Sequence, residues 1–335
     1  AFGVRPDRLI SVIGESRAGN SFAGPVGEGE AVRIFTGAPM PVGADWVVIQ
    51  ENAVREGDTV RFPRGVGETA FVRKAGSDFA AGAVLLPAGT RLTSRAMVAA
   101  AAADHAEVAV AAVPRVALFA TGDEIAAAGT AHLRPDAIPD SVSPGIAAMI
   151  AEAGGRLVER LAGADDLDTL SAIAGKSLAN ADLVVVTGGA SVGERDFAKP
   201  MFVAHGLDIV FDKVAIKPGK PVWFGKVSET WVLGLPGNPT SAMVTAALFL
   251  RPILARLQGA EFAHLWRRMQ LAAELPRTGH RETFARARWD AEGLVPLPNQ
   301  DSGSQATLLA ADWLIRCPLN QPAIPAGEWV TALGF

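Results

Sequence analysis

The feature that most constrains this chain is an alternation of apolar runs with helix-like segments over residues 114–261. "RVALFATGDE" and "LVVVTGG" have the length and composition of buried strands. "SPGIAAMIAEAGG" and "DDLDTLSAIAGKSLANA" have helical spacing, with closing glycines in the first and acidic residues at the start of the second. Such alternation is typical of a parallel sheet with helices on both faces. We therefore predict a central, doubly wound, mostly parallel α/β domain over these residues.

The flanking regions have a different character, so the expected fold class is α/β plus β modules. Residues 1–75 are rich in Gly and Pro, with strand-like runs such as "AVRIF" and "WVVIQE", and predict a β-rich N-terminal module. Residues 76–113 contain an alanine-rich helical pattern and predict a linker or helical domain. Residues 262–335 return to short strands and turns, typical of a β-barrel-like C-terminal domain. A chain of 335 residues also exceeds the usual size of one core.

Composition excludes several classes of function. A net charge of −4 argues against a nucleic-acid-binding groove. The single cysteine, Cys317, excludes a disulfide framework and a cysteine-based zinc site, and it favours a reducing compartment such as the cytoplasm. The longest apolar stretch, "AMVTAALFLRPIL", is interrupted by Arg251 and Pro252, so no membrane span is expected. "AFGVRPDRLI" lacks the apolar segment of a signal peptide.

Three of the predicted strands end in glycine turns, namely "ATGDE", "VTGGASVGERD" and "LPGNP". Ligands of open α/β sheets bind at the carboxyl ends of the strands. Bare amides of a turn or a helix start bind oxyanions. One such turn alone is better explained by tight chain reversal. Three turns at one edge of a sheet instead favour an anion-binding site.

Lysine placement is the second sign of an anion site. The chain has 24 arginines and 7 lysines, yet five of the lysines fall within residues 199–226. Lysine offers a compact point charge that suits a small tetrahedral oxyanion. In "KVAIKPGKP" a Pro-Gly turn is expected to place Lys217 and Lys220 at one strand end, while Lys213 and Lys217 share a face of one strand. A charged hairpin in solvent is the alternative interpretation.

Three carboxylates accompany these turns: Glu124, Glu194 and Asp196. Mg²⁺ is usually held by one or two carboxylates together with substrate phosphates, so these side chains are candidates for a magnesium site. Without a phosphate substrate, they are better explained as charges near helix starts.

A serine hydrolase is the first alternative, because "GGASVGERD" contains G-x-S-x-G with Ser191 as the nucleophile. A nucleophile elbow requires a helix directly after the serine and a downstream histidine. His205, His264 and His280 follow it in the sequence. However, "GERDFAKP" places three charges and Pro200 where that helix should pack, and no HGGG-type segment precedes it. The motif is therefore interpreted as a chance match.

Five segments together resemble one known family. "AVRIFTGAPMPVGADWVVIQE", "ATGDE", "TGGASVGERDF", "AIKPGKPVWFG" and "LGLPGNPTSAMVTAALFLRPIL" look like the successive motifs of the molybdopterin molybdenumtransferase (MoeA) family, which is related to the E domain of gephyrin. The similarity runs in order along the whole chain. It implies that adenylated molybdopterin and molybdate react with Mg²⁺ to give molybdenum cofactor and AMP. It also implies an elongated homodimer of four-domain subunits with a shared site, and molybdopterin adenylyltransferase as a partner enzyme.

The resemblance also implies roles for individual residues. Lys217 and Lys220 would bind molybdate, together with Arg281 or Arg286 and with Ser302. Asp196 and Glu124 would position Mg²⁺. The expected catalytic residues are Thr36, Glu124, Asp166 (or its neighbour Asp165), Asp196, Lys213 and Lys217. The expected substrate-binding residues are Gly122, Asp123, Gly188, Gly189, Ser191, Gly193, Glu194, Lys220, Pro236, Gly237, Asn238, Pro239, Arg281, Arg286 and Ser302.

The sequence departs from the family pattern in two places. The usual Asp-Ser-Asn before the first central helix reads Asp140, Ser141, Val142, so one hydrogen bond of the amide is expected to be absent. The family's preceding Asn-Ser-Ala-Met-Asp-Gly segment does not occur, and we expect that the N-terminal partner of the 76–113 domain precedes "AFGVR". A gephyrin-like dimeric scaffold that binds a partner peptide is the second alternative. Molybdate and tungstate are nearly isosteric, and both fit these expectations.

Overall fold

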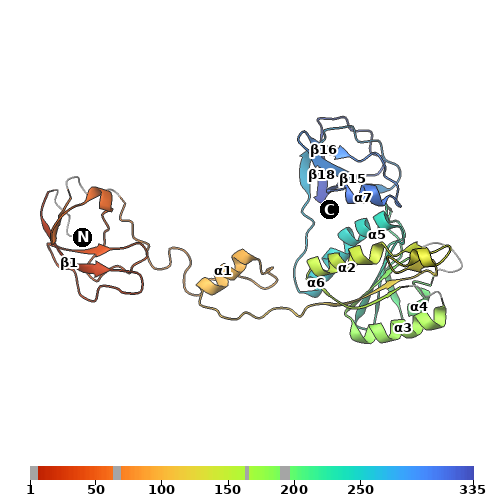
Figure 1. Cartoon of the computed structure of the whole chain (residues 1–335), viewed down its shortest axis with the longest axis horizontal. Helices are drawn as coiled ribbons and strands as arrows, with labels where there is room; N and C mark the ends of the chain where they lie inside the picture. Colours follow the sequence, from red (N-terminus) through yellow and green to blue (C-terminus); the bar gives the residue numbers. More distant parts are fainter. Residues whose placement is uncertain (1–6, 63–68, 163–165, 189–196) are drawn as a thin grey trace. The chain divides into compact units, whose positions relative to one another are not determined.

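The computed structural model describes residues 7–62, 69–162, 166–188 and 197–335. Its contacts divide the chain into two units, residues 1–84 and 85–335 (Figure 1). Each unit is described by itself. The division into four domains that the sequence indicates stays a prediction.

The first unit contains a small four-stranded sheet of order β2-β1-β4-β3. Its strands are β1 (Ile10–Ser16), β2 (Glu30–Ile34), β3 (Val54–Glu56) and β4 (Thr59–Arg61), with a single 3-10 turn at Gln50–Asn52. Strands β1 and β2 are parallel, and the predicted strand "AVRIF" corresponds to β2. The prediction for "WVVIQE" is wrong, because this segment forms no ladder with a described strand. Its Val47 amide donates to the carbonyl of Ala70 alone.

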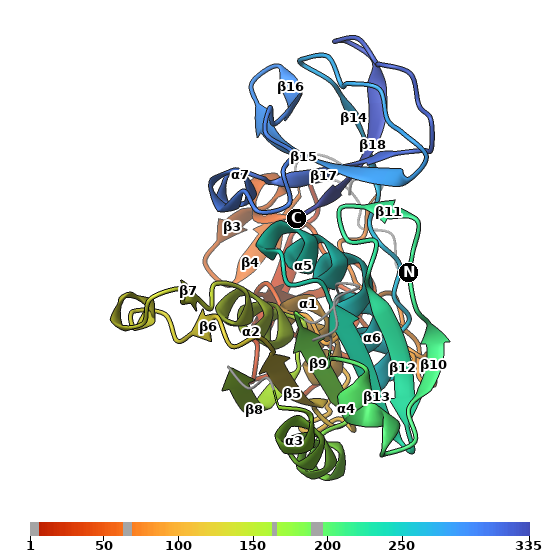
Figure 2. The same cartoon turned by 90° about the vertical axis from the view of Figure 1, so that its right-hand side faces the viewer.

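The second unit is built on a six-stranded sheet of order β10-β12-β13-β9-β5-β8 (Figure 2). Its strands are β5 (Arg115–Ala120), β8 (Arg156–Ala162), β9 (Leu183–Thr187), β10 (Asp208–Phe211), β12 (Trp223–Val227) and β13 (Thr230–Leu235). Strands β8, β5, β9 and β13 are parallel, and β12 is antiparallel to both of its neighbours. The predicted fold class is therefore confirmed.

Helices cover both faces of this sheet because successive side chains of its buried strands point to opposite sides. In β5, Val116 and Leu118 pack into one core cluster, and Ala117 and Phe119 pack into another. The first cluster includes side chains of α2 (Val142–Glu152), α5 (Pro239–Thr245) and α6 (Arg251–Leu257); the second includes those of α3 (Leu167–Asn180) and α4 (Pro200–Val203). Figure 1 shows these two layers of helices on either side of the strands. The expected helices over "SPGIAAMIAEAGG" and "DDLDTLSAIAGKSLANA" are confirmed.

A second sheet, of order β11-β15-β17-β18-β14 with β16 paired to β15, carries the C-terminal residues. Its strands are β11 (Ile216–Lys217), β14 (Arg267–Gln270), β15 (Glu282–Asp290), β16 (Gly293–Pro296), β17 (Trp313–Cys317) and β18 (Trp329–Gly334). The remaining elements of the unit are α1 (Ser94–Ala102), a 3-10 turn at Ala131–Leu133, α7 (Gln305–Leu309) and the pair β6 (Ile125–Ala126) and β7 (Ile138–Pro139). Strand β11 lies outside the central sheet, although β10 and β12 on either side of it in the sequence belong there.

The position of β11 corrects one expectation about the lysines. Lys213 lies in the connection between β10 and β11, whereas Lys217 is the last residue of β11. The two side chains therefore do not share the face of one strand. The apolar pattern of "IVFDKVAIK" resembles one continuous strand. The chain nevertheless leaves one sheet and enters the other at Asp212–Ala215, where no glycine marks the end of the strand.

The helix after β13 runs from Pro239 to Leu257 and passes through Pro252 without ending. Residues Ala246–Leu250 form a π-helical turn. Proline has no N–H and cannot bond the carbonyl four residues earlier, which here is that of Leu248. The ring Nε2 of His264 lies 3.1 Å from this oxygen and occupies the free position. Burial of the imidazole lowers the pKa of His264, and this effect outweighs the hydrogen bond to Leu248, which raises it.

This helix is long and apolar enough to cross a membrane by length and composition. However, 56% of its most apolar stretch is buried in the protein, where it supplies much of the first core cluster. Its hydrophobicity is therefore explained by packing against the sheet.

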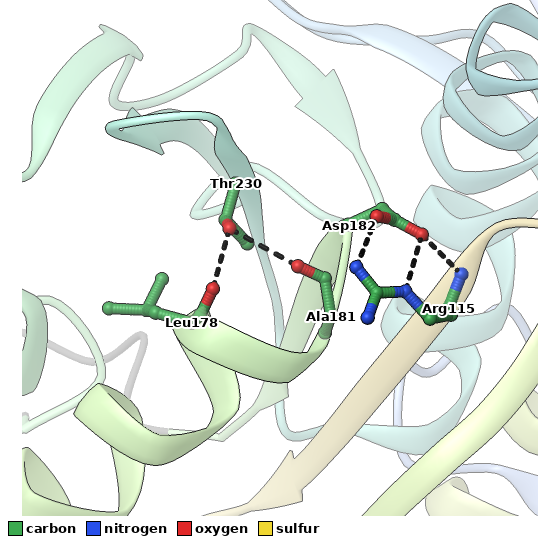
Figure 3. Close-up of polar contacts among 5 residues, drawn as sticks. All are labelled: Arg115, Leu178, Ala181, Asp182 and Thr230. Carbon is green, nitrogen blue, oxygen red and sulfur yellow. Dashed lines mark hydrogen bonds and ion pairs between the residues drawn. The ribbon is translucent and has the colours of Figure 1, made fainter.

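Polar contacts join the amino ends of the central strands (Figure 3). The carboxylate of Asp182, which precedes β9, accepts from the backbone amide of Arg115 at 2.7 Å and from its Nη2 at 2.9 Å. Thr230 at the start of β13 donates to the carbonyls of Leu178 (2.9 Å) and Ala181 (3.2 Å) at the end of α3. These contacts lie at the edge of the sheet opposite to the glycine turns.

Replacing Asp182 should weaken this edge. The hydrogen bond from Arg115 holds the pKa of Asp182 below its usual value. Its contribution to stability is therefore present above the unfolded-state pKa of about 3.9 and is lost as the pH falls through the lower, folded-state pKa. Because both side chains are about 40% exposed, we expect Asp182→Asn to cost only about 1 kcal/mol at pH 7.

Urea unfolding of wild type and Asp182→Asn at pH 7 and pH 3 measures this difference. The gap in unfolding free energy should shrink at pH 3. A gap that stays constant or widens with acid would contradict the assigned role of the carboxylate.

Candidate active site

The three glycine turns lie side by side at one edge of the central sheet. Thr187 of β9 pairs with Ala120 of β5 on one side and with Leu235 of β13 on the other. The three strands therefore end at the same level, and the turns that begin at Thr121, Gly188 and Pro236 start from there. The predicted convergence is confirmed for the described parts of these turns.

The turns approach one another so closely that only glycine fits. Gly188 has φ +92°, and a Cβ atom at this position would lie 2.6 Å from the carbonyl oxygen of Thr121. A Cβ on Gly237 would lie 3.2 Å from the Cα of Gly188. The turns therefore form a floor of bare backbone at the strand ends, where a ligand can approach main-chain atoms directly.

Glu124 is one of two described carboxylates in the first turn, next to Asp123. It is exposed, and a Cβ on Gly122 would lie 2.6 Å from its Oε2, so the glycine leaves room for the carboxylate. Within the described ranges, no hydrogen bond or ion pair engages its carboxylate, and no group of three or more His, Cys, Asp or Glu side chains is placed to hold a metal ion. Asp196, the other expected magnesium ligand, lies outside the described residues. A single free carboxylate fits a cation that completes its coordination with phosphates and water.

The third turn leads directly into the long helix, and the C-terminal residues cover this helix start. Asn238 precedes the first turn, with Pro239 at its first position. The Nδ2 of Asn238 lies 3.2 Å from Ser302 Oγ. The amide of Thr240 donates to the carbonyl of Ser302 at 3.1 Å, and its hydroxyl donates to that of Ser304 at 3.3 Å. The expected residues Asn238 and Ser302 are therefore in contact, although 64 positions separate them.

The Lys217–Lys220 turn packs against the same helix. Gly219 has φ +104°, and a Cβ there would lie 2.2 Å from the Cγ2 of Thr245, two helical turns from Asn238. The amide of Val214 closes the turn by donating to the carbonyl of Lys220 at 3.0 Å. Both lysines are exposed, and neither forms an ion pair with a described carboxylate. Their charges are therefore available to an anion.

Arg281 lies beside this lysine turn. β11 pairs in parallel with the start of β15, which matches Ile216 to Glu282 and Lys217 to Thr283. The Nη1 of Arg281 donates to the carbonyl of Ile216 at 3.3 Å. Arg281 is half-buried, in contrast to a core residue, and lies next to the lysine turn.

Arg286 is placed differently from Arg281. Its side chain is completely buried, and it donates to Thr240 Oγ1 at 3.2 Å and to Gln300 Oε1 at 3.3 Å. Burial lowers the pKa of its guanidinium. Of the two arginines that the sequence offered as molybdate contacts, Arg281 is therefore the one with an accessible side chain.

Other expected residues lie elsewhere or have a visible local role. The carboxylate of Asp166 caps α3 by accepting from the amide of Thr169 at 2.9 Å, which lowers its pKa. Asp140 caps α2 through the amide of Ser143 at 3.0 Å, despite the unusual Val142. Thr36 follows β2 in the first unit. The expected residues outside the described ranges are Asp165, Gly189, Ser191, Gly193, Glu194 and Asp196.

Two residues that contact Arg286, Thr240 and Gln300, were not expected from the sequence. Thr240 bonds the carbonyls of Ser302 and Ser304, and Gln300 bonds the backbone of Arg286 and Leu297. "PTS" after "LPGN" offered one signal, because a hydroxyl in the first turn of a helix is free to bond groups outside it. In "PNQDSGS", no sequence feature indicates that Gln300 has a different role from the polar residues around it.

Fold and site together define a multi-domain protein whose central α/β domain presents a cationic, glycine-lined edge. Family models match in the same order: the MoeA N-terminal region (domain I and II) over residues 3–103, a probable molybdopterin binding domain over 117–256, and the MoeA C-terminal region (domain IV) over 268–335.

Curated relatives agree with these models. A molybdopterin molybdenumtransferase of Nostoc sp. is 32% identical over 97% of this chain and 76% of its own length, and one of Synechococcus elongatus is 32% identical over 96% and 81%. A solved molybdopterin biosynthesis MoeA protein from Pyrococcus horikoshii is 29% identical, with a TM-score of 0.77 over 97% of this chain and 81% of its own. The chain belongs to the molybdopterin molybdenumtransferase family, whose members are transferases of molybdenum cofactor biosynthesis.

The backbone floor leads to a testable prediction about Gly188. Gly188→Ala should destabilise the protein, because the new methyl group meets the Thr121 carbonyl and because φ is positive. Gly206→Ala is the matched control, since Gly206 also has a positive φ, +81°, but has nothing within 4 Å of its added Cβ. A positive φ alone costs about 1 kcal/mol, and we expect a further loss of about 1–3 kcal/mol at Gly188. Equal thermal midpoints for the two variants would contradict the close approach.

Proposed function

We propose that this chain inserts molybdenum from molybdate into adenylated molybdopterin and releases molybdenum cofactor and AMP. The observation that carries the proposal is the arrangement around one helix. Lys217 and Lys220, which form no ion pair with a described carboxylate, lie on the turn whose Gly219 packs against the helix that contacts Ser302 at its start. A half-exposed arginine, Arg281, lies beside them. Family membership supplies the reaction, and this cationic cluster fits its small tetrahedral dianion.

The residues of the chain act by binding and orientation. Lys217, Lys220 and Arg281 would hold the oxyanion, and the hydroxyl of Ser302 would donate to one of its oxygens. The amides of the glycine turns would hold the phosphates of the adenylated pterin. Two anionic substrates repel each other in water, so fixing both against positive charge lowers the barrier through proximity and neutralisation. No step requires a nucleophile from the protein.

Mg²⁺ belongs to the proposal as well. Glu124 would hold it together with Asp196, and the position of Glu124 at the strand end, where no described side chain bonds its carboxylate, supports this assignment. When bound, the ion would neutralise charge on the phosphates. Gly122 leaves the space that Glu124 needs to reach such an ion.

The two alternatives receive no support from the relatives. A scaffold would not require Lys217 and Lys220, which form no ion pair with a described carboxylate. The hydrolase hypothesis depends on Ser191, which lies outside the described residues, and the matched families are not hydrolases. We therefore carry only the transferase forward.

The resemblance supports three further parts of the proposal. The protein would act in the cytoplasm, and molybdopterin adenylyltransferase would supply its substrate. It would also form a homodimer in which Thr36 of one subunit and the α/β domain of the other share a site.

The lysines provide the direct test of the reaction. The double variant Lys217→Ala with Lys220→Ala should reduce molybdate-dependent AMP release by about a hundredfold or more while leaving the thermal midpoint nearly unchanged, because both side chains are exposed. Lys226→Ala is the matched control, since Lys226 lies in β12 and pairs with Glu229 at 3.4 Å. Near-normal release by the double variant would defeat the proposed site.

Shared sites are tested by mixing two damaged subunits. Thr36→Ala and Asp196→Asn are each expected to be nearly inactive. If the site is shared, co-refolding equal amounts gives mixed dimers with one doubly damaged and one intact site, and roughly a quarter of wild-type activity should return. AMP release of the mixture is compared with each parent refolded alone. No gain, with mixed dimers confirmed by mass, would refute the shared site.

A further inference from the structure

In the first unit, two glycine turns lie together at the carboxyl ends of the parallel strands β1 and β2. After β1, a hairpin turn over residues 17–20 is closed by two backbone hydrogen bonds of 2.9 and 3.0 Å. After β2, a turn over residues 35–38 is closed by one backbone hydrogen bond of 3.0 Å. A Cβ on Gly37 would lie 4.0 Å from the Cβ of Ala18, so the two turns are neighbours.

Four side chains of β1 and β2 gather beside these turns. Glu15 and Arg33 are partners in the ladder. Two residues further along each strand, Arg17 and Phe35 come to the same face. The carboxylate of Glu15 accepts from both arginines. The guanidinium carbons of Arg33 and Arg17 lie 4.7 and 5.1 Å from the centre of the Phe35 ring. We call Arg17, Arg33 and Phe35 the arginine–phenyl platform.

The platform carries a surplus positive charge in contact with solvent. Its two guanidiniums share the carboxylate of Glu15, and no further described carboxylate pairs with either of them. The side chains of Arg17 and Arg33 are 60% and 46% exposed, and Phe35 is 37% exposed. Ion pairs and cation–π contacts at exposed positions contribute little to stability. The stability of the small sheet therefore gives only a weak reason for this arrangement.

The turn after β2 places hydrogen-bond donors next to the platform. Thr36 and Gly37 are exposed, and no described group accepts from their backbone amides or from the Thr36 hydroxyl. Free amides that follow one another in a turn form a binding site for anions. Gly37 has φ +81°, a conformation that glycine adopts without strain. Free donors, positive charge and an exposed ring therefore occur together over residues 33–37.

This combination fits a flat heteroaromatic ring that is linked to a phosphate. Guanidinium groups form paired hydrogen bonds with phosphate oxygens, and bases stack on aromatic rings and on arginine. An adenylated pterin has two ends of this kind. The model of a probable molybdopterin binding domain matches residues 117–256, which lie in the second unit. The adenylate end is therefore the better candidate for the platform.

We propose that the arginine–phenyl platform and the turn after it bind the adenylate end of the substrate. Arg17 and Arg33 hold the phosphate, and the exposed surface of Phe35 supports the adenine. This assignment rests on the function proposed above, in which the substrate is adenylated. It adds three residues to Thr36 for which the sequence alone indicated no role.

Three variants remove the parts of the platform one at a time. Arg17→Gln and Arg33→Gln each remove one charge, and Phe35→Leu removes the aromatic ring but keeps an apolar side chain. Because these side chains are exposed, each variant should keep a thermal midpoint close to that of the wild type. Arg55→Gln is the matched control, since Arg55 lies in β3 of the same sheet and donates to the carbonyl of Gly57 at 3.0 Å.

Calorimetric titration of the full chain with AMP and with inorganic phosphate measures binding without turnover. AMP should bind equally to the wild type and to Arg55→Gln, and about tenfold more weakly to each arginine variant. Phe35→Leu should weaken the binding of AMP but not that of phosphate. In AMP release, the arginine variants should raise the KM for adenylated molybdopterin, while the KM for molybdate stays within about twofold.

Several results would overturn this inference. They are a wild type that binds no AMP, arginine variants that bind AMP normally, an equal loss of binding in Arg55→Gln, and unfolding of the arginine variants. Failure of the proposed function looks different. The wild type would then release no AMP from adenylated molybdopterin, yet AMP itself would still bind, and the arginine variants would still bind it more weakly.

Discussion

The site depends on the in-register pairing of β5, β9 and β13. Because Ala120, Thr187 and Leu235 lie level with one another, the three turns that follow them begin side by side and lie close together. A side chain on Gly188 would then meet the carbonyl of Thr121, and one on Gly237 would lie tightly against Gly188. The glycines are thus a consequence of the sheet register, and the bare surface that results is what an anionic ligand can use.

The second requirement is a source of positive charge that stays unpaired, and the helix from Pro239 to Leu257 organises it. Its first turn contacts the segment with Ser302, and its next turns receive Gly219 of the lysine turn. The long apolar body of the helix is fixed in the core, and its path through Pro252 is completed by His264. Core packing therefore determines where the cations lie.

Much of this fold could be predicted from the sequence, because buried parallel strands and their covering helices have distinct periods. Strands that depend on a distant partner were harder. "WVVIQE" has the composition of a strand but no neighbour to pair with, and β11 pairs with β15 far along the chain. Pro252 interrupts the apolar run in the sequence but not the helix, and the ring of His264, twelve residues later, lies at the carbonyl that the proline leaves without a donor.

Site residues show the same division. The glycine turns and the lysines were visible as local patterns. Nothing local distinguishes Arg281 from Arg286, since both lie in "GHRETFARA" and only the pairing of β15 decides which one is buried. Thr240 offered only the local signal of a hydroxyl in the first turn of its helix, and Gln300 offered none. Both contact Arg286, which is distant from each of them in the sequence. Site residues that belong to a local sequence pattern could be predicted, whereas residues that depend on contacts between distant segments could not.

The path of the chain around β11 has a consequence for the evolution and engineering of this protein. The polypeptide leaves the central sheet after β10, contributes two residues to the C-terminal sheet, and returns as β12. The C-terminal sheet therefore contains a strand, β11, that comes from the middle of the central domain's sequence. A chain cut near residue 262 would leave Ile216 and Lys217 without the partners Glu282 and Thr283 with which they pair in β15. The central and C-terminal domains should therefore be kept together when the protein is expressed or recombined with others.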